Sequence, residues 1–168
     1  MGKSDDSLRT TRLVFYKEDI EVIGKTLTVF LKNANASCAL LVDKDGHLVT
    51  REGQSTTYDV DTISALVAGS FAATKQMAKL LGEEEFALMF HQGKKDNIQL
   101  SLVGERTILA VIFDDRTTLG MVRLYSSQVS SKLGQVFGDI AERKHETEKI
   151  SQDFGQAARG KLDDIFGS

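Results

Sequence analysis

Residues 59–81 read DVDTISALVAGSFAATKQMAKLL, and this stretch decides the fold because its pattern predicts a long helix. Asp59 suits the N-cap, since its carboxylate can accept hydrogen bonds from the first free N–H groups of a helix. Gly82 follows the stretch, at the position where a left-handed residue often ends a helix. No proline interrupts the pattern. The stretch therefore predicts one long helix at the centre of the fold.

The predicted helix has two different faces. Large apolar residues recur at spacings of three and four, which predicts a stripe that packs against the core. That stripe comprises Ile63, Leu66, Val67, Met77, Leu80 and Leu81. The second stripe has almost no side chain beyond Cβ and comprises Ala65, Ala68, Gly69, Ala72 and Ala73.

Gly69 lies within the predicted helix, where glycine costs about 1 kcal/mol relative to alanine. Close approach of another backbone would account for a glycine at this position. Two interpretations follow. Either the small-residue stripe lies under the sheet of the same chain, or it faces a partner.

The composition limits the classes of function. A chain of 168 residues with 41% hydrophobic content is enough for one ordinary domain. A net charge of −3 offers no basic field for nucleic acid. The single cysteine, Cys38, cannot form a disulfide within the chain and fits a reducing compartment. The N-terminus has no signal-peptide pattern and no apolar run approaches a membrane span, so we expect a cytoplasmic protein without membrane insertion.

The remaining patterns predict the order α-β-β-α-β-β-β-α. Besides 59–81, the expected helices are 17–33 and 119–137, and the expected strands are 37–43, 47–51, 86–92, 98–102 and 107–113. Residues 107–113 are apolar on both alternating faces, which places that strand in the middle of the sheet. Residues 86–92 are the best candidate for an open sheet edge. We therefore expect an α/β (α+β) fold, with a five-stranded antiparallel sheet, a helix pair on one face and one helix on the other.

The two ends of the chain differ from the middle. Residues 1–12 are polar and charged, which predicts disorder. Residues 138–168 are expected to form a charged linker and a tail, and the run ERKHETEK at 142–149 fits either a solvated helix extension or a linker. The chain ends in an acidic and apolar cluster that fits a partner-binding motif, a frayed terminus or a last turn docked on the domain. The cluster comprises Leu162, Asp163, Asp164, Ile165 and Phe166.

No catalytic or metal-binding constellation is present in the sequence. The three histidines share no spacing, and the H-E-x-x-H, G-x-S-x-G and P-loop motifs are absent. Asp43 and Asp45 precede Gly46, as in a calcium loop, but the further ligands of such a loop are missing. Cys38 lies in an apolar strand, which would keep its thiol protonated and inert. We expect no cofactor, no metal and no catalytic activity of its own, which favours a binding module.

Four stretches carry a resemblance to a known family. They are ALLVDKDGHLV at 39–49, LVAGSFAATKQMAKLLGE at 66–83, FHQGKKDNIQLSLVG at 90–104 and ILAVIFDDRTTLGMVRL at 108–124. Over residues 13–137 the chain resembles the bacterial Roadblock (dynein light chain) domain proteins. Within that family, it is most similar to the polarity regulators of the small Ras-like GTPase MglA, and the terminal LDDIFG segment is similar to the end of some of those chains.

The resemblance implies a homodimer with a shared sheet that activates an MglA-like GTPase in its GTP state, near a cell pole. It implies that the paired central helices are the partner surface. On that basis the expected partner-binding residues are Ala68, Gly69, Ala72, Ala73 and Gln76, together with the cluster at 162–166.

A GTPase activator often supplies an arginine finger, and the candidates by residue type are Arg106, Arg116 and Arg123. Arg106 and Arg116 are more simply explained as loop charges or contacts at a sheet end. The resemblance implies a different mechanism, in which the dimer repositions the catalytic Arg and Gln of the GTPase itself. We therefore assign no catalytic residue to this chain.

Two other functions remain open on the sequence. One is a Roadblock scaffold that binds the GTPase or another polarity protein without accelerating hydrolysis. The other is a small-molecule sensor, because five-stranded sheets with flanking helices also occur in ligand-binding modules. A sensor would need a polar-lined cavity, whereas the sequence shows the pattern of a filled apolar interior.

Overall fold

The computed structural model describes residues 14–54 and 57–167. The expected disordered segment, residues 1–12, lies outside the described residues. The chain divides into two compact units, of which the larger is Tyr16–Val136. The smaller unit contains the helical residues from Phe137 onward and the described residues up to Phe15.

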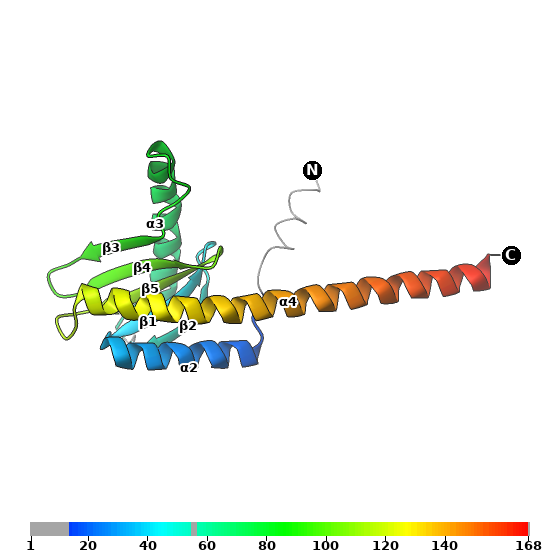
Figure 1. Ribbon diagram of the computed structural model, residues 1–168, viewed down its shortest axis with the longest axis horizontal. Helices are drawn as coiled ribbons and strands as arrows, with labels where there is room; N and C mark the ends of the chain where they lie inside the picture. Colours follow the sequence, from blue (N-terminus) through cyan, green and yellow to red (C-terminus); the bar gives the residue numbers. More distant parts are fainter. Residues whose placement is uncertain (1–13, 55–56, 168) are drawn as a thin grey trace. The chain divides into compact units, whose positions relative to one another are not determined.

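The larger unit contains one five-stranded antiparallel sheet with the strand order β2-β1-β5-β4-β3 (Figure 1). The strands are β1 (Cys38–Asp43), β2 (Leu48–Gly53), β3 (Leu88–Gln92), β4 (Asn97–Val103) and β5 (Thr107–Phe113). Every residue of β5 is buried and β5 lies in the middle of the sheet, which confirms the expectation from its apolar pattern. β3 forms one edge of the sheet, also as predicted, although it begins two residues later than expected.

Three helices complete the predicted order of elements. They are α2 (Lys17–Ala34), α3 (Val60–Leu80) and α4 (Leu119–Phe166). α3 begins as the sequence predicts, because Oδ1 of Asp59 accepts a hydrogen bond from the N–H of Thr62 at 3.1 Å. The chain leaves α3 at Gly82, whose φ of +83° is the left-handed conformation that glycine adopts at little cost.

The helices cover both faces of the sheet. α3 packs on one face, where Val67 and Phe71 join a buried cluster with Leu40 of β1 and Ile108 of β5. α2 and the part of α4 within the larger unit lie side by side on the opposite face (Figure 1). The predicted arrangement, a helix pair on one face and a single helix on the other, is confirmed.

The turn between β1 and β2 approaches α3 closely. Gly46 adopts a φ of +93°, and a Cβ built on it would lie 3.2 Å from the Cα of Ala65 and 3.6 Å from the Cβ of Ala68. The small residues at this point of α3 therefore leave room for the hairpin of the same chain. Of these two residues Ala68 is buried and Ala65 is exposed, so the interpretation that the small stripe packs within its own chain holds for Ala68, against the β1–β2 turn.

The prediction for the large apolar residues of α3 was mostly wrong. Val67 is buried and Ile63 is partly buried, but the other four members of the expected core stripe are exposed. They are Leu66 (65%), Met77 (54%), Leu80 (87%) and Leu81 (73%). For Met77, Leu80 and Leu81 the cause is that the C-terminal end of α3 extends beyond the sheet (Figure 1).

α4 corrects the expectation of a flexible charged linker. Residues 119–166 form one continuous helix, so the alternative of a solvated helix extension is the right one for 142–149. In the smaller unit, the ring of Phe15 packs edge-on against that of Phe137, with 5.7 Å between the ring centroids. Ile150 and Phe154 further along are exposed. Among the described helices, none combines the length and the apolar character that crossing a membrane would require.

Candidate partner-binding surface

The outward face of α3 carries four of the predicted site residues. Gly69, Ala72, Ala73 and Gln76 are all exposed on it. The exposed side chains of Met77, Leu80 and Leu81 continue the same helix toward its free end. Exposed apolar side chains in a continuous patch are characteristic of an interaction surface. We call this group, from Gly69 to Leu81, the α3 face.

Ala68 differs from the rest of the expected stripe. Its side chain is only 7% exposed and lies beneath the Gly46 turn. Gly69 is the opposite case, because a Cβ built on it would meet no described atom within 4 Å outside its own local helix. Packing within the described chain therefore does not require glycine at position 69, although it does require a small residue at 68.

The β3 edge adjoins the α3 face. Oγ1 of Thr74, on α3, lies 3.1 Å from Sδ of Met89, on β3. Leu88 at the start of β3 is 38% exposed, and the outer side of this strand pairs with no other described strand. An unpaired strand edge presents backbone N–H and C=O groups that can bind another chain. The α3 face and the β3 edge are therefore both candidate contact regions of the larger unit.

The second group of predicted residues lies in the smaller unit. Leu162, Ile165 and Phe166 are exposed at 53%, 69% and 79%, and Asp163 and Asp164 beside them are exposed as well. Their spacing of three and four places the three apolar side chains on one side of α4. We call residues 162–166 the terminal segment.

Arg116 is held at the end of the sheet. Its Nε donates to Oδ1 of Asp114 at 2.9 Å, and its Nη2 donates to Oγ of Ser37 at 2.7 Å. The hydrogen bond from Arg116 lowers the pKa of Asp114 and strengthens the charge pair. Of the two explanations offered by the sequence, a loop charge or a sheet-end contact, these hydrogen bonds favour the sheet-end contact.

The arrangement around Asp43 explains the partial calcium-loop pattern as a turn. Oδ1 of Asp43 accepts hydrogen bonds from the backbone N–H groups of Asp45 and His47, at 3.0 and 2.9 Å. The carboxylate therefore already serves the β1–β2 hairpin. Cys38, at the other end of β1, is fully buried, and burial raises the pKa of its thiol to about 11, so the thiol is protonated at neutral pH as expected.

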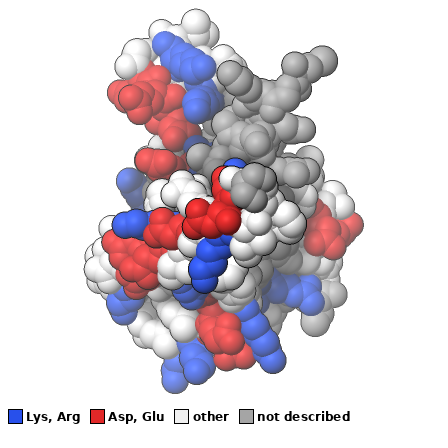
Figure 2. Space-filling model, turned by 90° about the vertical axis from the view of Figure 1, so that its right-hand side faces the viewer, with Lys and Arg blue, Asp and Glu red and all other residues white. Residues whose placement is uncertain are grey.

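Charges of both signs are interspersed over the side of the molecule drawn in Figure 2. No broad field of a single sign is visible among the described residues on this side. A strongly basic face is the usual electrostatic footprint of nucleic-acid binding. This view offers no support for such a function.

Sequence reasoning missed the exposed part of the α3 face. Helical spacing predicts that Leu80 and Leu81 belong to the core, because a periodic stripe does not reveal what covers it. A signal was nevertheless present: adjacent leucines directly before Gly82 widen the apolar pattern beyond one stripe at the very end of the helix.

Comparisons with known proteins agree on the family. Residues 23–113 match the family model of the Roadblock/LC7 domain. The fold is similar to that of MglB from Myxococcus xanthus, with 41% sequence identity and a TM-score of 0.72, and to that of the gliding protein MglB from Thermus thermophilus, with 32% identity and a TM-score of 0.71. A third structure, described as MglB with a tetrameric arrangement, is 30% identical with a TM-score of 0.73. Each of the three similarities covers 76% of this chain and 96% of the other.

These matches agree with the resemblance that the four sequence stretches carried. That resemblance implied the fold observed here, a five-stranded antiparallel sheet with flanking helices. The likeness to the MglB proteins spans nearly the whole of each of their chains, at identities that reach 41%. This chain belongs to the Roadblock/LC7 domain family and, within it, resembles the MglB proteins.

Proposed function

We propose that this protein acts as a homodimer that binds a small Ras-like GTPase of the MglA type in its GTP state and stimulates GTP hydrolysis. The likeness to MglB proteins supports this proposal, because the regulators of MglA are the part of the family that the sequence resembles. Such a protein would control cell polarity or motility from the cytoplasm, at a cell pole.

The observation that carries the proposal is the exposed α3 face beside the free β3 edge. In the proposed dimer, two β3 edges pair into one sheet and the two α3 helices lie next to each other. Pairing of this kind would cover the exposed backbone groups of β3 and part of the apolar surface near Leu80. Small side chains at Gly69, Ala72 and Ala73 would let the GTPase approach the two helices closely.

The dimer would act without an arginine finger of its own. Arg116 is occupied by Asp114 and Ser37. We propose that binding orders the catalytic Arg and Gln of the GTPase, so that stabilisation of the transition-state charge comes from the GTPase itself. The terminal segment would add a second contact to the same GTPase, since tethering raises its local concentration.

A single-turnover assay of GTP hydrolysis tests this proposal. The GTPase is loaded with GTP, this protein is added in excess, and phosphate release is followed. We expect the rate to rise on the order of tenfold or more. Binding without any rise in rate would replace the activator by a scaffold, and absence of binding would reject both functions.

Two variants locate the contact. Ala72→Arg places a guanidinium on the α3 face and should abolish both binding and stimulation, because it blocks close approach. Ser131→Arg is the matched control, since Ser131 is an exposed small residue on α4. Equal loss in both variants would mean that the added charge, and not the α3 face, is responsible.

Deleting residues 150–168 tests the terminal segment. We expect dimerisation to remain while affinity for the GTPase or the rate of nucleotide exchange changes. Unchanged affinity, hydrolysis and exchange would show that the segment makes no contact with the GTPase.

A further inference from the structure

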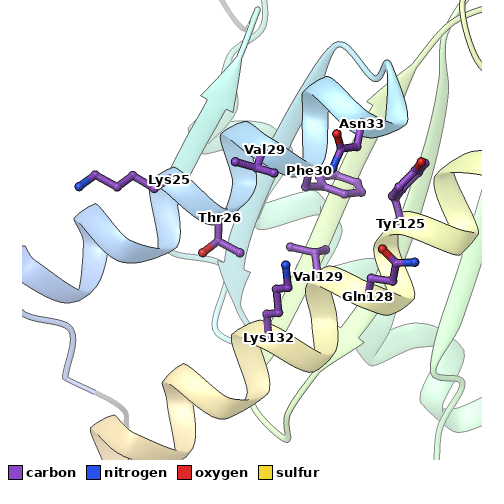
Figure 3. A pocket seen from close by; sticks show the side chains of 9 residues that line it. All are labelled: Lys25, Thr26, Val29, Phe30, Asn33, Tyr125, Gln128, Val129 and Lys132. Atoms are coloured by element: carbon purple, nitrogen blue, oxygen red, sulfur yellow. The ribbon is translucent and has the colours of Figure 1, made fainter.

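A groove lies between α2 and α4 on the side of the sheet opposite α3 (Figure 3). Its volume is about 250 Å³. Its lining consists of Lys25, Thr26, Val29, Phe30 and Asn33 from α2, and Tyr125, Gln128, Val129 and Lys132 from α4. All of these residues belong to the larger unit, and none is used by the function proposed above.

The groove has an apolar middle and a basic end. Val29 is 55% exposed although it is aliphatic, and Phe30 and Val129 lie beneath it as a buried floor. Lys25 and Lys132 lie toward one end, and the neutral side chains of Asn33, Tyr125 and Gln128 lie toward the other (Figure 3). The groove is therefore suited to an apolar side chain that is flanked by negative charge.

Neither lysine forms an ion pair within the described part of the chain. Ion pairs there join Lys44 to Glu85, Asp114 to Arg116, and Lys144 to Glu148, and Nδ1 of His47 lies 3.4 Å from Oδ2 of Asp43. Lys25 and Lys132 take part in none of them, and both are exposed. A second hollow borders the other side of α2 and shares Lys25 and Val29, and Glu21 and Glu52 line that side.

The terminal segment has the complementary chemistry. Leu162, Ile165 and Phe166 present an exposed apolar side, and Asp163 and Asp164 supply two adjacent negative charges. The apolar side chains match the middle of the groove, and the aspartates match the two lysines.

We propose that the groove between α2 and α4 binds the terminal segment of a second copy of this chain. The contact is small and its charges are exposed, so each single contact is weak and sensitive to salt. Because each dimer carries two segments, one contact makes the second more favourable. The contacts would link dimers into larger assemblies. The linking of dimers rests on the homodimer of the proposed function, whereas the binding of one segment to one groove does not.

The test uses a labelled peptide of residues 157–168 and no GTPase, so its outcome is independent of the proposed function. The receptor is the full chain carrying Leu162→Asp and Phe166→Asp, which disables its own segment. Fluorescence anisotropy should show saturable binding. Adding Lys25→Glu and Lys132→Glu to the receptor should weaken its affinity for the peptide at least tenfold. A peptide with Asp163→Lys and Asp164→Lys should restore the affinity for this altered receptor.

Lys94→Glu with Lys95→Glu is the matched control, because these two exposed lysines lie in the β3–β4 turn, away from the groove. The control should bind the unaltered peptide as well as the receptor does. Circular dichroism checks that every variant is folded. Absence of peptide binding, equal affinity for the groove and control variants, or failure of the reversed peptide to restore binding would each overturn the proposal.

Sedimentation velocity of the unaltered chain gives a second readout. Species larger than the dimer should grow with concentration, shrink as salt rises and disappear in Lys132→Glu. A distribution that Lys132→Glu leaves unchanged would also overturn the proposal.

Discussion

The guanidinium of Arg116 donates to the hydroxyl of Ser37 at 2.7 Å, across 79 positions of sequence. This contact joins the loop after β5 to the residue before β1. The carbonyl of Arg116 also accepts a hydrogen bond from Nδ2 of Asn35, the residue that ends α2. Arg116 therefore joins the loop after β5 to the α2–β1 connection at one end of the sheet.

Replacing Arg116 should affect stability more than function. Arg116→Ala removes the contacts to Ser37 and Asp114, so the midpoint of urea unfolding should fall. Stimulation of GTP hydrolysis, measured at a temperature where the variant is folded, should stay within about twofold of the unaltered protein, since an arginine finger would be worth about 10³-fold or more. A loss of that larger size in a folded variant would identify Arg116 as a finger after all.

The α3 face should control assembly. Leu80→Lys with Leu81→Lys puts charges on exposed leucines, which leaves the isolated fold intact but opposes burial in a dimer. Light scattering at tens of micromolar should report a dimer for the unaltered chain and a monomer for this variant. Ile150→Lys with Phe154→Lys, also at exposed positions, is the control and should remain dimeric. A monomeric unaltered chain would exclude the shared sheet.

Acid should weaken the fold through two aspartates. The pKa of Asp59 is lowered chiefly by the side-chain hydrogen bond from Thr62, and that of Asp114 chiefly by the hydrogen bond from Arg116. A group with a lowered pKa contributes stability above its unfolded value, near 3.8, and loses it as the pH falls through the folded value. Urea unfolding between about pH 6 and pH 2.5 should therefore show stability declining below about pH 4.

Asp59→Asn and Asp114→Asn separate these contributions. Asparagine also caps helices, so Asp59→Asn removes the charge while keeping an acceptor for the N–H of Thr62. Each variant should show a shallower decline of stability in acid than the unaltered chain. Identical slopes in all three proteins would mean that other carboxylates cause the decline.

Gln99 should be a destabilising residue. Its side chain is fully buried on β4, and neither Oε1 nor Nε2 has a hydrogen-bond partner among the described residues. Buried polar atoms without partners are costly, so Gln99→Leu should raise the free energy of unfolding by about 1 kcal/mol. Chemical denaturation measures the change, with the exposed Gln135→Leu as a control that should be nearly neutral. Destabilisation by Gln99→Leu would indicate that an internal water satisfies the amide.

Cys38 should resist thiol reagents in the folded protein. Burial keeps its pKa near 11, so very little thiolate is present at pH 8 and no reagent reaches the sulfur. Labelling by a chromogenic disulfide should be complete only in denaturant. Fast labelling under native conditions would show that β1 opens readily.

The sequence by itself determined the order of the elements. Some residues favour a conformation that depends on only a few neighbouring residues. Examples are Asp59, Gly82 and Gly46, and all three adopt the conformation that their residue types predict. The central position of β5 also followed from sequence, because only a strand covered on both faces can be apolar at every position.

Only the tertiary structure decided how the surface of α3 is divided. Helical periodicity identifies stripes, but which stripe is covered depends on where the sheet ends and where the β1–β2 hairpin meets the helix. The Gly46 turn covers Ala68 and leaves Gly69 outside, and the sheet ends before Leu80. The groove between α2 and α4 likewise joins residues about 100 positions apart, such as Lys25 and Lys132, whose proximity no local pattern encodes. Contacts of this kind arise from packing between distant segments, and for that reason the sequence alone could not place them.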